Sequence, residues 1–243
     1  MSGFWLITNV FLDVFPWIFL LYMPFKDRLR FSVITTGVLN YIALTIYLLI
    51  FKKITTAEFY NLDVMFSYRV VQIFVVLTLV IFLVDDYIEK SLFVYGLLLP
   101  ISVVILVWAS HINNYITIRQ SATYLDTAVL RIIISEICFP FMYMLWKKYI
   151  VPVVKTDNRR QWRQAWIIPI IFSIVSLAYC ENNFEITYMR LNQVIARFTL
   201  SIGVVIVSVM QFSNMNTEEK IVRAEEKAKR SKMLIDMKSE QYN

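Results

Sequence analysis

Five ionisable residues interrupt segments of the chain that are otherwise apolar. They are Asp13, Arg69, Arg131, Glu136 and Arg197. A charged side chain at the centre of a bilayer costs at least ~2.5 kcal/mol on insertion scales, so such residues generally find a partner. The three arginines fall near the same predicted ends of their segments, and the two acids lie deeper as counter-charges. We expect a polar pocket for a ligand carboxylate or carbonyl group; the alternative is arginines that only anchor their helices at the interface.

Enzyme chemistry finds little support elsewhere in the sequence. His111 is the one histidine, and it has no His, Cys or carboxylate neighbour at metal-ligand spacing. The four glycines are too far apart for a phosphate-binding loop. Asp85, Asp86 and Glu89 resemble one acidic magnesium motif of membrane prenyltransferases, but a second acidic cluster is missing and a short hydrophilic loop is favoured. We therefore predict no catalytic residue, no metal and no cofactor in this chain.

The elements that position these residues are predicted to be membrane-spanning helices. Of the 243 residues, 58% are hydrophobic and 16% aromatic, which exceeds what a soluble domain of this size can bury. A bilayer crossing needs about 20 apolar residues. Seven apolar segments approach or reach that length: 4–22, 31–51, 64–84, 91–109, 127–151, 165–179 and 194–212. We predict an all-α polytopic membrane bundle with six or seven spans, since segment 165–179 is barely long enough.

Lysine and arginine gather in alternate loops and in the C-terminal tail. With seven spans, one side of the membrane receives the following loop residues: Lys26, Arg28, Arg30, Lys90, Lys147, Lys148, Lys155, Arg159, Arg160 and Arg163. This asymmetry predicts a multi-pass membrane protein with an external N-terminus and a cytoplasmic C-terminus. Lys52 and Lys53 are exceptions on the external side. The net charge of +6 thus fits membrane orientation, and nucleic acid is not an expected partner.

The last span leads directly into a charged helix without Gly or Pro. We divide the chain into a membrane sensor domain, 1–213, and a cytoplasmic linker and dimerisation helix, 214–243. One narrow face of the span is small or polar and suited to close helix packing: Arg197, Ser201, Val204, Ser208 and Gln211. A weak coiled-coil seam continues along the tail through Ile221, Ala224, Ala228 and Ile235. The seam predicts a homodimer; the alternative is a solvated helix with charge pairs four residues apart.

Three motifs carry a resemblance to a known family. They are WKKYIVPVVKTDNRRQWRQAWIIPIIFS at 146–173, IEKSLFVYGLLLP at 88–100, and SKMLIDMKSEQYN at 231–243. With them the chain resembles the membrane domain of GHKL-type sensor histidine kinases of the quorum-sensing, AgrC-like class. The resemblance covers most of the chain and rests on hydrophobic and aromatic motifs.

The resemblance implies the membrane input domain of a bacterial two-component system, located in the plasma membrane. Such a domain senses an extracellular signal, here a small peptide, and relays it through the last span to a kinase domain. The chain departs from the family in having no phospho-accepting histidine after the linker helix, so we expect a sensor domain truncated before that residue. ATP, Mg²⁺ and a response regulator would belong to the missing kinase region, whereas membrane lipid and a second copy of the chain are direct partners.

Two other functions remain open at this point. A small membrane transporter would be expected to show internal repeats and helices broken at matching positions, and the prolines do not repeat in that way. A noncatalytic membrane scaffold would tolerate the same tail but would not need the buried acids.

Overall fold

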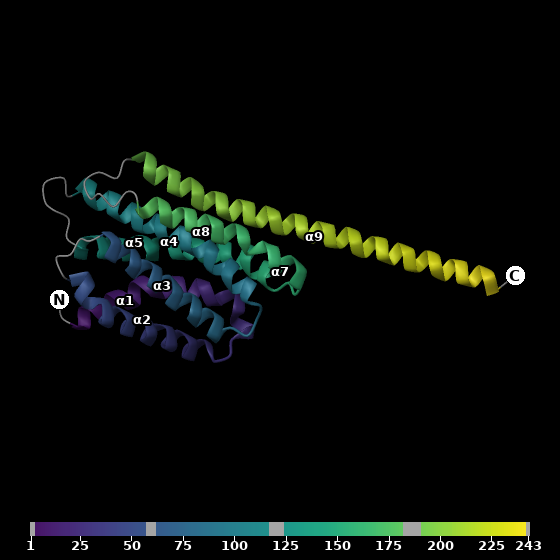
Figure 1. The fold of residues 1–243 in the computed structure, drawn as a ribbon, viewed down its shortest axis with the longest axis horizontal. Helices are drawn as coiled ribbons and strands as arrows, with labels where there is room; N and C mark the ends of the chain where they lie inside the picture. Colours follow the sequence, from purple (N-terminus) through teal and green to yellow (C-terminus); the bar gives the residue numbers. More distant parts are fainter. Residues whose placement is uncertain (1–2, 57–61, 117–123, 182–190, 242–243) are drawn as a thin grey trace.

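The fold is a bundle of helices from which one very long helix projects (Figure 1). The computed structural model describes residues 3–56, 62–116, 124–181 and 191–241. Seven longer helices form the body: α1 (Gly3–Tyr22), α2 (Val33–Thr56), α3 (Leu62–Leu83), α4 (Ile88–Ile116), α5 (Tyr124–Leu145), α8 (Ile167–Glu181) and α9 (Leu191–Gln241). Four short elements join them: η1 (Met23–Arg28), η2 (Trp146–Ile150), α6 (Val151–Val154) and α7 (Arg159–Ala165). The prediction of an all-α fold is confirmed over the described residues.

Six of the seven apolar segments each largely coincide with one helix, and segment 127–151 covers α5, η2 and the first residue of α6. Not every helix meets a strict criterion for a membrane span. Among the described residues, only Ile88–Ile105 and Val129–Val154 are long and apolar enough to cross a bilayer. Shorter apolar stretches lie at Val33–Tyr47, Val71–Leu83 and Phe198–Asn214. The number of spans, six or seven, therefore stays a prediction.

Helix α4 is the central helix of the bundle and contains a proline. Pro100 has no N–H to donate to the carbonyl of Gly96, four residues earlier, so that carbonyl needs another donor. The Ser173 hydroxyl of α8 donates to the Gly96 carbonyl at 2.7 Å, and the Ser201 hydroxyl of α9 donates to the Pro100 carbonyl at 3.0 Å. Both serines are buried. The expected small face of the last span therefore packs against α4, with Ser201, Val204 and Ser208 all inside the bundle.

Gly96 sets the distance between α4 and α8, and its replacement is a test of that packing. A Cβ atom at Gly96 would lie 2.9 Å from the Cβ of Pro169, whereas a Cβ at Gly37 would meet nothing within 4 Å. We expect Gly96→Ala to lower the free energy of unfolding by about 1 to 3 kcal/mol, as overpacking does. Gly37→Ala should be neutral or stabilising by up to about 1 kcal/mol through helix propensity. Thermal unfolding in detergent, followed by circular dichroism, measures both; equal stability of the two variants would contradict the close packing.

The basic segment 147–163, expected as a loop, is mostly helical. Trp146–Ile150 forms one π-helical turn that ends two residues before Pro152, whose missing N–H and bulky ring disrupt the regular hydrogen-bond ladder. The backbone N–H groups of Gln161 and Trp162 then bond to the Asn158 carbonyl as α7 begins. Trp146, Ile150, Val154 and Trp162 are buried as a result. The segment is therefore part of the core at this end of the bundle.

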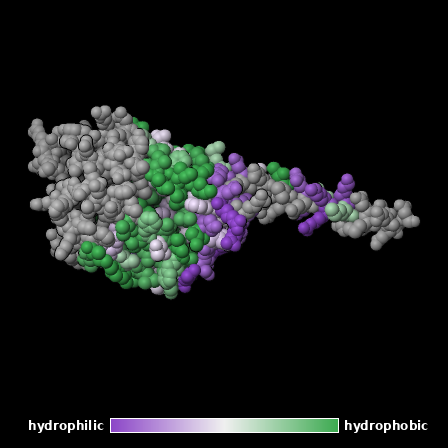
Figure 2. Space-filling model, viewed as in Figure 1, coloured by the Kyte–Doolittle hydropathy of each residue, from purple (hydrophilic) through white to green (hydrophobic). Residues whose placement is uncertain are grey.

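The outer surface of the body is strongly apolar. Only 11% of the apolar segment Val129–Val154, which is mostly α5, is buried inside the bundle. Large apolar side chains on several helices are more than 60% exposed, among them Ile34, Ile50, Phe74 and Ile137. Figure 2 shows a hydrophobic surface over the described body, bordered by a hydrophilic band where α9 leaves it.

Candidate functional site

The hydrophilic band contains a site built from three connections between helices. Residues 28–30 pair with residues 83–85: the Arg30 N–H donates to the Leu83 carbonyl at 3.0 Å, and the Asp85 N–H donates to the Arg28 carbonyl at 2.8 Å. This short antiparallel contact fixes the end of η1 beside the start of α4. The connection between α6 and α7 completes the site through Asp157.

Four charged residues form what we call the polar cluster: Arg28, Asp86, Lys90 and Asp157. The Arg28 guanidinium donates to Asp86 at 2.9 Å and to Asp157 at 2.7 Å. The Lys90 ammonium donates to Asp86 at 3.0 Å and to Asp157 at 3.0 Å. Each cation thus contacts both carboxylates, and the charges balance. The cluster ties together three chain segments that are up to 129 residues apart.

Lys90 is the buried centre of the polar cluster. Its side chain is 0% exposed and that of Asp86 is 3% exposed, whereas Arg28 and Asp157 reach the surface with 36% and 60% exposed. The ammonium also lies 5.3 Å from the ring centre of Tyr87 and 5.6 Å from that of Trp162, within cation–π range. A charge so far from water is stable only when it is paired and hydrogen-bonded. Asp86 therefore carries most of the compensation, and it also accepts the Tyr87 N–H at 2.7 Å.

The exposed members of the polar cluster have shifted pKa values. Hydrogen bonds from Arg28, then from Lys90, hold the pKa of the Asp157 carboxyl well below its ordinary value, and the Asp157 hydrogen bond raises the pKa of Arg28. The folded-state pKa of Asp157 thus lies below its unfolded value. Its ion pairs are fully formed at neutral pH and are lost only as the pH falls through the depressed pKa. Water around the exposed carboxylate weakens this contribution to stability.

An aromatic group connects the polar cluster to α9. Phe93 of α4, Trp162 of α7 and Phe212 of α9 are each at most 1% exposed. We call them the aromatic cluster. The Trp162 ring centre lies 5.3 Å from that of Phe93 and 5.1 Å from that of Phe212, and the Trp162 Nε1–H donates to the Thr156 carbonyl at 3.0 Å. Trp162 therefore contacts Lys90 and Phe212 together, which places the charges next to the turn of α9 that contains Phe212.

This site was not predicted from the sequence, where its basic residues were only topology signals and Asp86 belonged to a hydrophilic loop. These basic residues are Lys26, Arg28, Arg30, Lys90 and Lys155. The available signal was the short spacing of opposite charges in KDRLR, DDYIEK and KTDNRR, three segments predicted on one side of the membrane. Further pairs follow the same logic: Lys155 donates to Asp27 at 3.1 Å, and Arg30 lies 3.8 Å from Asp85.

Of the five predicted ligand-sensing side chains, the structure describes those of Arg131 and Glu136. Asp13 on α1, Arg69 on α3 and Arg197 on α9 have side chains outside the described part of the structure. Arg131 on α5 is half-buried, and Glu136 is exposed. Glu136 shares its outward face with Ile133 and Ile137, so within a single chain it does not face the interior of the bundle. A pocket formed by all five residues stays a prediction.

The proposed dimerisation seam lies on the projecting part of α9. Ile221, Ala224 and Ala228 are exposed, and the side chain of Ile235 is outside the described set. One unbroken helix runs across the expected domain boundary at residues 213 and 214. Both observations leave the seam available for a second copy of the chain, which stays a prediction.

Known proteins give no further constraint on the site. Comparisons of the chain with protein-family models, curated proteins and solved structures find no match.

Proposed function

We propose that this chain is the membrane input domain of a sensor histidine kinase, which detects an external signal and relays it through α9 to a kinase domain. The observation that carries the proposal is α9 itself. This helix is 51 residues long without a break; its first part is packed in the bundle and its last part projects well beyond it (Figure 1). A continuous helix transmits rotation or translation along its axis, which is what a relay between two domains needs.

The membrane placement is supported by the surface of the body. A face as apolar as that of α5 is unfavourable in water and favourable in lipid, and the hydrophilic band next to it fits the water interface. The band contains most of the basic residues of the loops, which favours a cytoplasmic position for this end and for the C-terminus. In this arrangement the polar and aromatic clusters lie at the cytoplasmic interface, where α9 leaves the membrane.

The clusters supply a mechanism for the relay. A change in the bundle that moves α4 relative to the connection before α7 would alter the polar cluster, because Lys90 belongs to α4 and Asp157 to that connection. Trp162 contacts both Lys90 and Phe212, so the same change reaches α9. The ligand is expected to be a small peptide that acts from the opposite side of the membrane.

Insertions into α9 test the relay directly. The full chain is fused after Asn243 to the kinase domain of an AgrC-like kinase. Alanines are then inserted after Met215, which follows the buried Phe212 on α9. One alanine rotates the distal helix by about 100°, whereas seven restore its orientation to within about 20°. We expect one alanine to change basal autophosphorylation by at least about five-fold, the lower end of typical coupling energies, and seven to restore it.

The matched control is a fusion to a catalytically inactive kinase domain, with the same alanines inserted after Asn243 at the fusion point. This control confirms that the fusions reach the membrane in equal amounts. Autophosphorylation that does not vary with the number of inserted residues would show that the orientation of α9 carries no signal. Cysteine labelling that places the C-terminal end outside the cell would refute the input-domain function itself.

A further inference from the structure

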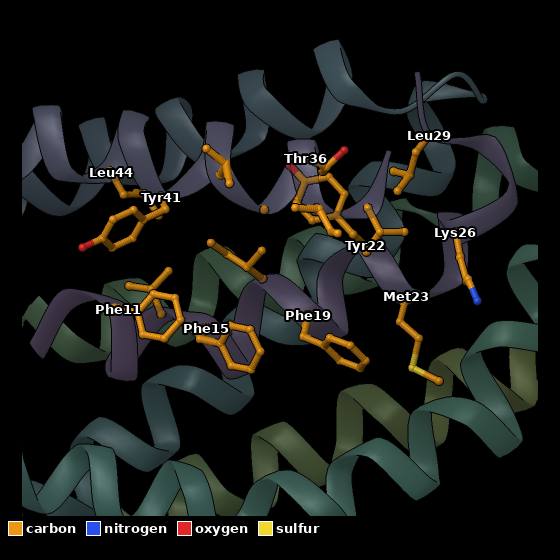
Figure 3. Close-up of a pocket in the computed structure, with 16 residues that line it drawn as sticks. Phe11, Phe15, Phe19, Tyr22, Met23, Lys26, Leu29, Thr36, Tyr41 and Leu44 are labelled. Carbon is orange, nitrogen blue, oxygen red and sulfur yellow. The ribbon is translucent and has the colours of Figure 1, made fainter. Parts of the chain in front are cut away.

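A groove runs between α1 and α2 on the outer surface of the body (Figure 3). Its volume is about 550 Å³, and its lining is almost entirely apolar. Phe11, Phe15 and Phe19 of α1 form one wall. At one end the Phe11 ring packs edge-on against Tyr41 of α2, with ring centres 5.5 Å apart. At the other end the groove reaches the hydrophilic band.

The mouth of the groove at the band carries a lysine. Lys26 lines the groove (Figure 3), and it belongs to the segment whose other charged residues all have ion-pair partners. Asp27 binds Lys155, Arg28 binds Asp86 and Asp157, and Arg30 lies near Asp85. Within the described part of the chain, Lys26 has no carboxylate at ion-pair distance. A cation of this kind at the edge of an apolar groove is complementary to an amphiphile with an anionic head.

A fixed polar contact keeps the two walls of the groove together. The Tyr22 hydroxyl donates to Oδ1 of Asn40 at 3.1 Å, and Nδ2 of Asn40 donates to the Thr36 carbonyl at 2.8 Å. Tyr22 and Asn40 are both buried. The hydroxyl oxygen of Thr36, another lining residue, is buried with no hydrogen-bond partner among the described residues. The groove is therefore preformed, and it offers a polar atom part of the way along its length.

We propose that this groove binds one acyl chain of an anionic phospholipid, with the phosphate at Lys26. The inference rests on the proposed membrane placement, because the lipid enters sideways from the cytoplasmic leaflet. An ammonium near a membrane surface contributes about 1 kcal/mol of attraction to anionic lipid. The phenylalanine wall and the open space at Gly37 accept the chain, since nothing lies within 4 Å of a Cβ built there.

Photo-crosslinking tests the occupant. The full chain is reconstituted in vesicles of phosphatidylcholine with a minor fraction of phosphatidylglycerol, carrying benzoyl-phenylalanine at Val38, which lines the groove, or at Ile46, which is exposed on α2 outside it. Mass spectrometry then identifies the adducts. At Val38 we expect phosphatidylglycerol to be enriched about five-fold over its bulk fraction, the equivalent of about 1 kcal/mol. At Ile46 the adducts should follow the bulk composition.

Two variants, each with a control, test which residues make the groove selective for phosphatidylglycerol. Lys26→Gln should remove the enrichment at Val38, while Lys148→Gln, at an exposed lysine away from the groove, should leave it unchanged. Gly37→Phe should remove it by filling the groove, since a Cβ at this position meets nothing within 4 Å, and Ile42→Phe is the matched control on the same helix.

The possible outcomes separate this inference from the proposed function. Bulk lipid composition at both positions, or an adduct with a second copy of the chain at Val38, overturns the lipid site alone. The absence of lipid adducts at both positions overturns the membrane placement and the input-domain function with it.

Discussion

Replacing Asp86 with alanine is expected to lower the free energy of unfolding by about 3 to 5 kcal/mol, the cost of removing the buried partner of a buried ion pair. Lys90 cannot reach water, since its side chain is 0% exposed, and the remaining carboxylate of Asp157 is itself 60% exposed. The variant also removes the acceptor of the Tyr87 N–H at the start of α4. Chemical or thermal unfolding in detergent measures the difference from the unchanged chain.

The neighbouring residue provides a matched control. Asp85 is 78% exposed, and its nearest cation, Arg30, is 3.8 Å away, so Asp85→Ala should change stability by less than about 1 kcal/mol. Lys90→Met in the Asp86→Ala background should recover part of the loss, because the apolar side chain no longer requires a counter-charge. Equal effects of Asp85→Ala and Asp86→Ala, or no recovery in the double variant, would show that the buried lysine is not held by Asp86.

The helices were predictable from the sequence because their signal is local. Each apolar segment is bounded by charged or polar residues, and over the described residues six of the seven largely coincide with one helix. The continuity of α9 followed from the absence of Gly and Pro between the last span and the tail. The segment 147–163 was the exception, because its charges suggested a loop whereas Trp146 and Trp162 bury it in the core.

The polar cluster was harder to predict because its contacts are distant along the chain. Arg28 and Asp157 are 129 residues apart, and nothing in the local pattern of either segment names the other. The topology prediction placed both segments on one side of the membrane, which was the necessary first step. The pairing itself depends on the backbone contact between residues 28–30 and 83–85, and on the turn before α7, which brings Asp157 over Lys90.

Whether Glu136 is buried or exposed could not be predicted from its position in an apolar segment. A residue in the middle of such a helix can face the bundle or the surroundings, and the choice depends on which face of α5 meets α1 and α4. Phe139 and Tyr143 make ring contacts with Phe19 of α1, whereas Glu136 lies on the exposed face. If the bundle lies in a membrane as proposed, Glu136 either faces lipid or meets a second copy of the chain, and the homodimer prediction bears directly on it.

Phe212→Ala is expected to have the largest effect on signalling, because Phe212 is the member of the aromatic cluster that belongs to α9. Truncating a buried phenylalanine costs about 3 to 5 kcal/mol where the surroundings do not collapse into the cavity. Phe212 is 1% exposed, and its ring centre lies 6.4 Å from that of Phe93 as well as 5.1 Å from that of Trp162. In the kinase fusion, this variant should make basal autophosphorylation insensitive to a single alanine inserted after Met215.

The same substitution elsewhere on α9 separates signalling from general damage to the helix. Phe198 is 48% exposed, so Phe198→Ala removes an equal side chain without disturbing the aromatic cluster, and the insertion effect should survive. Phe212→Leu, which keeps most of the buried volume, should retain part of it. If Phe212→Ala preserves the full dependence on insertion while lowering stability, the aromatic cluster only holds α9 in place. The orientation of α9 would then be controlled by its contacts with α4 and α8 earlier in the helix, through the buried Ser201 and Val204.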